Sequence, residues 1–146
     1  MGITVRVIDL GKLQKFVTKE DMQAAGKFML ALQKKRIARG EGSRGSKMKR
    51  YSKAYQKERA EAGLPINVRT LRRTGSMLES RAVLSSTDTE TRIGFKKAAP
   101  YVYVNQARTP FVKATKTERN LVSKFTRRVV RERLRKQLAA ARAGAK

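Results

Sequence analysis

Two clusters of cationic side chains are the strongest chemical signal in this sequence of 146 residues. Residues 34–59 hold eleven Lys or Arg and two acids, and residues 113–146 hold twelve Lys or Arg and two acids. Cations at this density either bind a polyanion, such as nucleic-acid phosphates or an acidic protein face, or form the solvated faces of helices. From the clusters we predict a polyanion or acidic-partner contact at six residues: Arg44, Lys47, Lys49, Arg50, Arg127 and Arg128.

Two tyrosines, Tyr51 and Tyr55, lie four residues apart among the cations of the first cluster. Aromatic rings between cations can stack on nucleobases. The same spacing places both rings on one face of a helix, and we expect them to pack that helix onto the core.

Most of the residue types that enzyme mechanisms use are absent or scattered. The chain has no Cys and no His, which excludes thiolate nucleophiles, disulfides, imidazole acid–base chemistry and nearly all zinc sites. The eleven acids are dispersed, and the pair Glu58 and Glu61 has cationic neighbours that keep both carboxylates ionised. A carboxylate-pair hydrolase is therefore the least supported interpretation, and we predict no catalytic, cofactor or metal site.

The overall charge points to an acidic partner. The chain carries 36 Lys or Arg and 11 acids, a formal net charge of +25, whereas a small soluble domain usually has a magnitude of roughly 2–8. Such a chain repels itself unless something acidic neutralises it. Apolar residues make up 40% of it, enough for a core. We see no membrane span or signal peptide and expect no membrane partner.

Hydrophobic periodicity and helix-boundary residues predict an α+β fold. Thr18 and Ser52 have the properties of helix N-caps, and Gly40 and Gly63 those of helix stops. The stretch 101–105 has strand composition, although Pro100 could also open a short helix. The predicted elements are a strand at 3–9, helices at 19–38 and 53–62, a helical turn at 77–78, strands at 81–86 and 91–95, and a last helix at 117–141.

These elements predict a small antiparallel sheet or hairpin packed against a long N-terminal helix, with a long projecting C-terminal helix. Residues 1–130 form a single domain with a flexible basic loop at 40–50, and residues 131–146 form a basic helical arm and tail. The predicted core consists of Met22, Ala25, Phe28, Met29 and Leu32 from the first helix and Val83, Leu84, Ile93 and Phe95 from the hairpin.

The last helix has two apolar faces. At ~100° per residue, Leu121, Val122, Phe125 and Val129 cluster on one face, and Val130, Leu134 and Leu138 lie nearly opposite. A monomer of this size has little core to cover both. We therefore predict that the second half packs on a neighbouring subunit or an acidic protein, through Val130, Arg131, Leu134, Arg135 and Leu138.

The segment Arg108-Thr109-Pro110-Phe111 is predicted to be an anchoring corner. Pro110 fixes its own φ and keeps Thr109 out of the helical region. Phe111 should then plug the core, while Arg108 pairs with an acid across a subunit boundary. We assign Arg108 and Phe111 to the subunit interface.

Four segments of the chain, in order, resemble the virion-morphogenesis or tail-completion proteins of tailed bacteriophages, small proteins of the head–tail junction. They are Gly45–Gly63 with its Tyr51-Ser52-x-x-Tyr55 signature, LRRTGSMLES at Leu71–Ser80, RIGF at Arg92–Phe95, and the corner at Arg108–Phe111. The resemblance covers residues 45–135. The chain departs from the pattern at residues 104–107, where the family usually has a glycine.

The resemblance implies a structural protein of the virion, assembled in the host cytoplasm, and not an enzyme. Its copies would form a homo-oligomeric ring, sixfold, that joins the tail to the head, in a tail-completion, tail-terminator or head-closure layer. Electrostatics predicts that most of the basic surface meets acidic faces of other neck and tail proteins, with a minority near the end of the packaged DNA. The alternative is a basic nucleic-acid-binding protein of ribosomal or nucleoid type, which charge alone supports.

Overall fold

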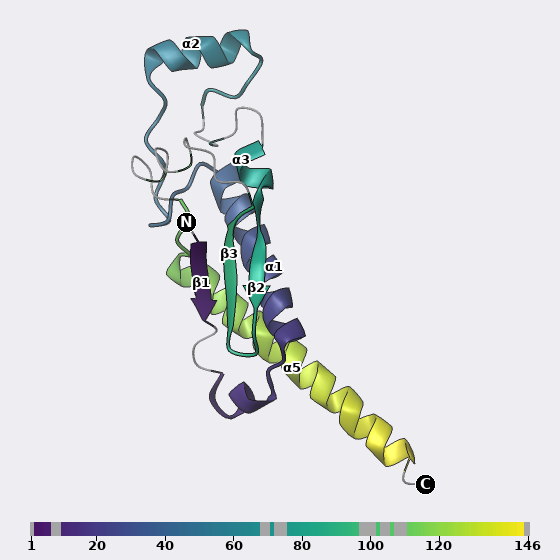
Figure 1. Cartoon of the computed structure of the whole chain (residues 1–146). Coiled ribbons are helices and arrows are strands. Elements are labelled where there is room, and N and C mark those ends of the chain that lie inside the picture. The colour runs from purple at the N-terminus through teal and green to yellow at the C-terminus, as the bar shows by residue number, and fades with distance from the viewer. Residues whose placement is uncertain are drawn as a thin grey trace.

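A computed structural model describes residues 2–6, 10–67, 71, 76–96, 102, 106 and 111–144 of the chain. The architecture is α+β, which confirms the predicted fold class (Figure 1). In chain order the elements are β1 (Gly2–Arg6), the 3₁₀ helix η1 (Gly11–Phe16), α1 (Lys19–Ala38), α2 (Lys53–Glu61), α3 (Ser76–Glu79), β2 (Arg81–Ser86), β3 (Glu90–Phe95) and α5 (Lys116–Gly144).

The three strands form one antiparallel sheet in the order β1-β3-β2. Ile93 of β3 is central and pairs with Ile3 of β1 and Val83 of β2. Of the strand predicted at 3–9, β1 contains the part up to Arg6, and residues 7–9 lie outside the described residues. α1 lies against β2 and β3, and α5 packs against α1 (Figure 1).

Gly26 allows this close packing between α1 and the sheet. A Cβ atom at this position would lie 2.9 Å from both Thr91 Oγ1 and Val83 Cγ2. Because carbon atoms do not normally approach side chains that closely, a larger residue would push the helix away from β2 and β3. The absence of a side chain at Gly26 thus sets the distance between the two layers.

A β-bulge in β2 exposes Leu84, so the prediction that this residue belongs to the core is wrong. The pairing with β3 steps from Val83↔Ile93 to Ser85↔Arg92, so Leu84 is the extra residue. An extra residue breaks the strict alternation of side chains between the two faces of a strand. Leu84 is therefore 51% exposed instead of buried.

α1 has the boundaries that its sequence predicts. Thr18 Oγ1 accepts a hydrogen bond from the Asp21 amide, and the Asp21 carboxylate accepts one from the Thr18 amide, which forms a capping box. At the other end Gly40 has a φ of 70°, a conformation that a side chain disfavours. The helix therefore ends there, and Gly63 ends α2 with a φ of 66° in the same way.

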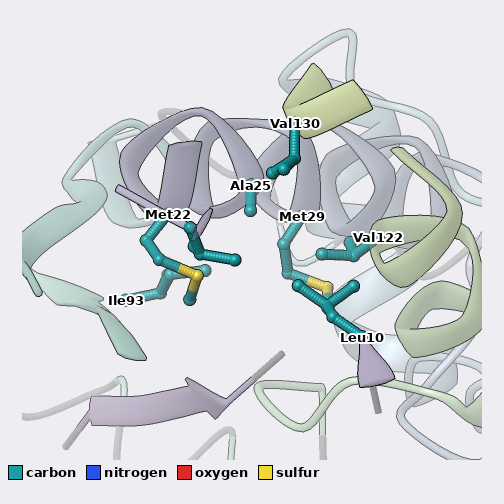
Figure 2. Close-up of a cluster of buried hydrophobic side chains, with 8 residues drawn as sticks. Leu10, Met22, Ala25, Met29, Ile93, Val122 and Val130 are labelled. Carbon is teal, nitrogen blue, oxygen red and sulfur yellow. The ribbon is translucent and has the colours of Figure 1, made fainter. Parts of the chain in front are cut away.

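The main hydrophobic core combines α1, β3, α5 and the segment before α1 (Figure 2). Its buried residues are Leu10, Val17, Met22, Ala25, Met29, Ile93, Val122 and Val130. Phe28 and Leu32 are only partly buried at its edge, and the Phe28 ring stacks on Phe125 with centroids 4.5 Å apart. A second cluster consists of Ile37, Met48, Met77, Phe95, Val102, Phe111 and Val112.

Among the described residues, the two tyrosines belong to neither hydrophobic cluster. Their rings instead lie against Arg59, whose guanidinium is 4.6 Å from the Tyr51 centroid and 5.8 Å from that of Tyr55. Arg59 is 1% exposed and donates from Nε to the Pro65 carbonyl at 3.0 Å. Arg59, the last cation of the first cluster, is thus the centre around which the α2 segment folds, apart from the sheet (Figure 1).

Candidate interaction surface

α5 begins at a capping box that also lies in the protein interior. Thr115 Oγ1 accepts from the Glu118 amide at 3.1 Å, and Glu118 Oε2 accepts from the Thr115 amide at 2.8 Å. The cap is Thr115, so α5 begins at Lys116, one residue before the start predicted at 117. Glu118 is 5% exposed, so this acid needs a cationic partner inside the protein.

Arg36 of α1 supplies that cation. Its Nε donates to Glu118 Oε1 at 2.7 Å, and its Nη2 donates to the carbonyls of Phe111 at 3.0 Å and Lys113 at 3.1 Å. These bonds hold the segment that leads into α5 against α1. Phe111 is fully buried in the second cluster. This confirms that it plugs the core, and its assignment to a subunit interface is wrong because it has no exposed surface.

Gln33 and Arg81 form a second buried polar pair, which extends this junction. Gln33 donates from Nε2 to the Val112 carbonyl at 3.1 Å and accepts at Oε1 from Arg81 Nη2 at 2.5 Å. Burial lowers the pKa of Arg81 to about 10, with Arg36 acting in the same direction and Glu118 opposing it. Within the described part of the chain, Nε and Nη1 of Arg81 lack hydrogen-bond partners. The junction therefore holds two guanidinium groups against one carboxylate.

From this junction on, α5 packs against α1 along a row of buried residues, the docked stripe, whose position moves around the helix. Its buried residues are Glu118, Val122, Thr126 and Val130, each four positions apart. Two helices that cross contact each other along such an i, i+4 row, which moves around the helix by about 40° per step. Val130 is 0% exposed, so its predicted role at a subunit interface is wrong. The prediction of two opposite apolar faces is wrong for these two residues, because the row moves around the helix and brings both Val122 and Val130 to the same core.

Docking ends at two residues of the predicted arm. Arg133 Nη2 donates to Asp21 Oδ2 at 2.9 Å and to the Phe16 carbonyl, which ties α5 to the start of α1. Leu134 is partly buried against the main core. The part of α5 that leaves the body thus begins at Arg135 and not at Arg131.

We call residues 135–144 the arm. All ten of its residues are exposed, and Leu138 keeps 62% of its surface. In Figure 1 it extends beyond the other elements as the last part of α5. The sequence places Arg135, Lys136 and Arg142 in it and no acid. The predicted interface residue Leu138 is thus available to a partner, and so is Arg135.

A line of cations follows α5 on the side opposite its docked stripe. Its members, Lys124, Arg128, Arg131, Arg135 and Arg142, are spaced by four, three, four and seven residues, which keeps them within about 40° of one line. All five are exposed. We call this set the cationic stripe; at about 1.5 Å per residue it is about 27 Å long.

The surroundings of the cationic stripe are almost wholly cationic as well. A shallow hollow of about 370 Å³ is lined by Lys124, Arg127, Arg128, Arg131, Glu132 and Arg135. Glu132, the acid in this lining, lies 4.0 Å from Arg128 Nε. The predicted contacts Arg127 and Arg128 and the predicted interface residues Arg131 and Arg135 therefore belong to one surface.

The basic loop at 40–50 has a defined turn. Glu41 pairs with Lys47 across a β-bridge, the Gly42 amide donates to the Ser46 carbonyl at 2.9 Å, and Met48 is buried in the second cluster. A hydrogen bond from Arg39 lowers the pKa of Glu41, with further help from the charges of Arg39, Lys47 and Arg36.

The cations predicted in this loop, Arg44, Lys47, Lys49 and Arg50, are all exposed. Lys47 Nζ donates to the Arg39 carbonyl at 2.8 Å, so it is partly engaged in the turn. The loop follows the end of α1 and lies at the opposite end of the molecule from the arm (Figure 1). The structure thus separates the predicted polyanion contacts into two surfaces. Arg108 lies outside the described residues.

Two features of this surface and its support were not predicted from the sequence. One is the buried junction of Gln33, Arg36, Arg81 and Glu118, whose signal is two polar residues that continue the apolar row of α1 after Met29. The other is the cationic stripe, whose spacing is visible in the sequence. Both features consist of polar residues that recur at helical spacing, a periodicity that hydrophobic patterning does not register.

Among the described residues, no group of three or more acids could hold a metal ion. None of the helices in the described part is long and apolar enough to cross a membrane. Comparison of the chain with protein-family models, with curated proteins and with solved structures finds no match.

Proposed function

We propose that this chain is a structural protein of a bacteriophage neck, which forms a homo-oligomeric ring that completes the tail and joins it to the head. The assignment to the neck rests on the sequence resemblance over residues 45–135. The observation that carries the ring is the arm, ten helical residues that are exposed along their whole length. An isolated helix this short is marginal in water, so its packing partner is expected to lie outside the monomer.

In the proposed ring the arm of one copy packs on the body of the next. Such head-to-tail contacts use two different surfaces and close into a ring when the rotation between copies is regular. The first part of α5 holds the arm at a fixed angle, because Glu118 and Arg133 tie it to α1 at both ends of the docked stripe. The chain acts by binding and not by catalysis, and the neck layer it occupies is left open among tail completion, tail terminator and head closure.

The net charge sets a condition for assembly. Copies that each carry +25 repel one another, and this repulsion is weakened by salt or by an acidic partner. We therefore expect rings to be favoured at raised ionic strength or in the presence of an acidic neck protein, and monomers to predominate at low salt.

Native mass spectrometry of the purified chain tests the proposal, with ionic strength varied before transfer. The full chain should give rings, whereas a chain truncated after Leu134 should stay monomeric and unfold at nearly the same temperature. The control is Lys27→Gln/Lys34→Gln/Lys35→Gln, which removes three exposed cations from α1 and keeps the arm. A full chain that stays monomeric while binding any polyanion would favour the ribosomal or nucleoid alternative, and rings formed by the truncated chain would refute the role of the arm.

A further inference from the structure

The cationic stripe of α5 has a geometry that a purely solvated helix face does not require. Its five cations lie along one side of a docked helix, opposite Val122 and Thr126, which fix that helix in the core. The body therefore holds the stripe straight and outward over its first three members, and the arm carries it on to Arg135 and Arg142. We propose that this stripe binds the phosphate backbone of duplex nucleic acid.

The composition of the stripe favours nucleic acid over an acidic protein. A specific protein–protein interface has an apolar or aromatic centre surrounded by polar groups. Here the exposed large apolar side chains beside the line are Leu121, before its first member, and Leu138, within the arm, and the flanking Arg127 and Lys136 add further charge. Binding of nucleic acid that does not depend on sequence needs only cations that neutralise phosphates. The stripe thus has what a phosphate backbone requires and lacks the apolar centre of a protein interface.

The dimensions fit a duplex. DNA presents one negative charge per about 1.7 Å of its axis, so a stripe of about 27 Å faces many phosphates at once. An α-helix with its side chains is about 10–12 Å wide, which matches a major groove of about 12 Å. Because the arm is exposed on all sides, it can enter a groove that the body itself could not. Contacts to phosphates carry no sequence information, so we expect little dependence on base sequence.

This inference goes beyond the neck assignment, since the stripe is complete within a single copy of the chain. A ring would repeat it around one axis, but a monomer should bind as well. Binding can therefore be measured in low-salt conditions where the monomer predominates, and its outcome does not depend on whether rings form.

Fluorescence anisotropy with a labelled duplex of about 20 bp tests the proposal, using the full chain over a series of salt concentrations. The test variant is Lys124→Gln/Arg131→Gln/Arg135→Gln, three exposed residues on one face of α5. Each lost phosphate contact should reduce the slope of log K against log salt by about 0.9, so the slope should fall by about 2–3. At about 0.1 M salt the affinity should drop roughly 100-fold or more.

The α1 triple variant, Lys27→Gln/Lys34→Gln/Lys35→Gln, is the matched control because it removes the same net charge from a different face. It should bind the duplex within a few-fold of the unmodified chain, and both variants should keep its unfolding temperature. Equal losses in the two variants would overturn the proposal, because net charge and not the stripe would then bind the duplex. Poly-glutamate that binds as tightly as the duplex, with the same loss in the α5 variant, would overturn the choice of nucleic acid.

Discussion

The two parts of α5 have similar compositions and different environments. Residues 116–134 contribute the buried stripe and two ion pairs to α1, whereas residues 135–144 are exposed throughout. Both parts are rich in Arg and both continue the same helix. The difference is that the first part has groups placed every four residues to meet α1. In the second part the same spacing reaches Leu138 and Arg142, and both are exposed.

This comparison indicates how the molecule divides its tasks. Glu118 and Arg133 act as anchors at the two ends of the docked part, and each meets a polar group that α1 has buried or partly buried. Beyond Leu134 the helix has no such anchor among the described residues. Stability should therefore be sensitive to changes in the first part and indifferent to changes in the second, where only binding should respond.

The largest expected effect comes from removing the buried acid. Glu118→Gln would leave Arg36 and Arg81 buried without a carboxylate, and such an unpaired buried charge costs about 3–5 kcal/mol. Glu132→Gln, on the exposed side of the same helix, should change the free energy of unfolding by less than about 0.5 kcal/mol. Chemical denaturation of both variants checks this. Similar midpoints for the two would mean that the junction does not hold α5 to the body.

A smaller effect on stability is expected from truncating an apolar residue of α5, and its size should depend on whether that residue lies in the core or in the arm. Val130→Ala leaves a cavity in the main core and should cost about 1–3 kcal/mol, while Leu138→Ala in the arm should change stability by less than about 0.5 kcal/mol. Leu138→Ala should nevertheless weaken ring formation. Paired urea titrations and native mass spectrometry would measure both properties, and a stability loss for Leu138→Ala as large as that of Val130→Ala would place the arm inside the fold.

The smallest effect concerns pH and the turn beside the docked part. The pKa of Glu41 is lowered in the folded chain, chiefly by its hydrogen bond from Arg39. Its contribution is therefore present above the ordinary carboxyl pKa and is lost as pH falls through the lowered value. An NMR titration of the Gly42 amide should give a midpoint below that of an ordinary glutamate. In Arg39→Gln the midpoint should return toward the ordinary value, and an unchanged midpoint there would assign the shift to another cation.

Elements whose signals are local could be predicted from the sequence. The Thr18 capping box, the Ser52 cap and the two glycine stops need only a few neighbouring residues, and these boundaries of α1 and α2 agree with the structure. The strands β2 and β3 were also found, because alternation is a local pattern. The order of the sheet was not predicted, since β1 and β3 are far apart in the sequence.

Features that depend on distant contacts could not be predicted in the same way. The exposure of Leu84 follows from a bulge, which is a property of strand pairing. The burial of Val130 follows from the crossing of α5 over α1, and no single helical wheel contains that angle. The burial of Arg59 depends on two aromatic rings that meet it only after folding.

For the candidate surface, the exposure of individual residues could be predicted from the sequence more readily than their grouping. The sequence placed Arg131, Arg135 and Leu138 on a surface for partners, and all three are exposed. It assigned Arg128 to a different contact, although the structure brings this residue onto the same line. Helical spacing applied to cations would have joined them, whereas the buried junction needed the position of α1 relative to α5.

Hydrogen exchange along α5 tests the central claim most directly, which is that the arm is left unpacked by its own chain and is packed by a neighbour. In the free monomer, amides of 116–134 should be protected to a degree similar to those of α1, and amides of 135–144 should exchange much faster. In the assembled ring, the arm should become protected as well. An arm that is as protected as α1 in the monomer, or that stays unprotected in the ring, would contradict the account.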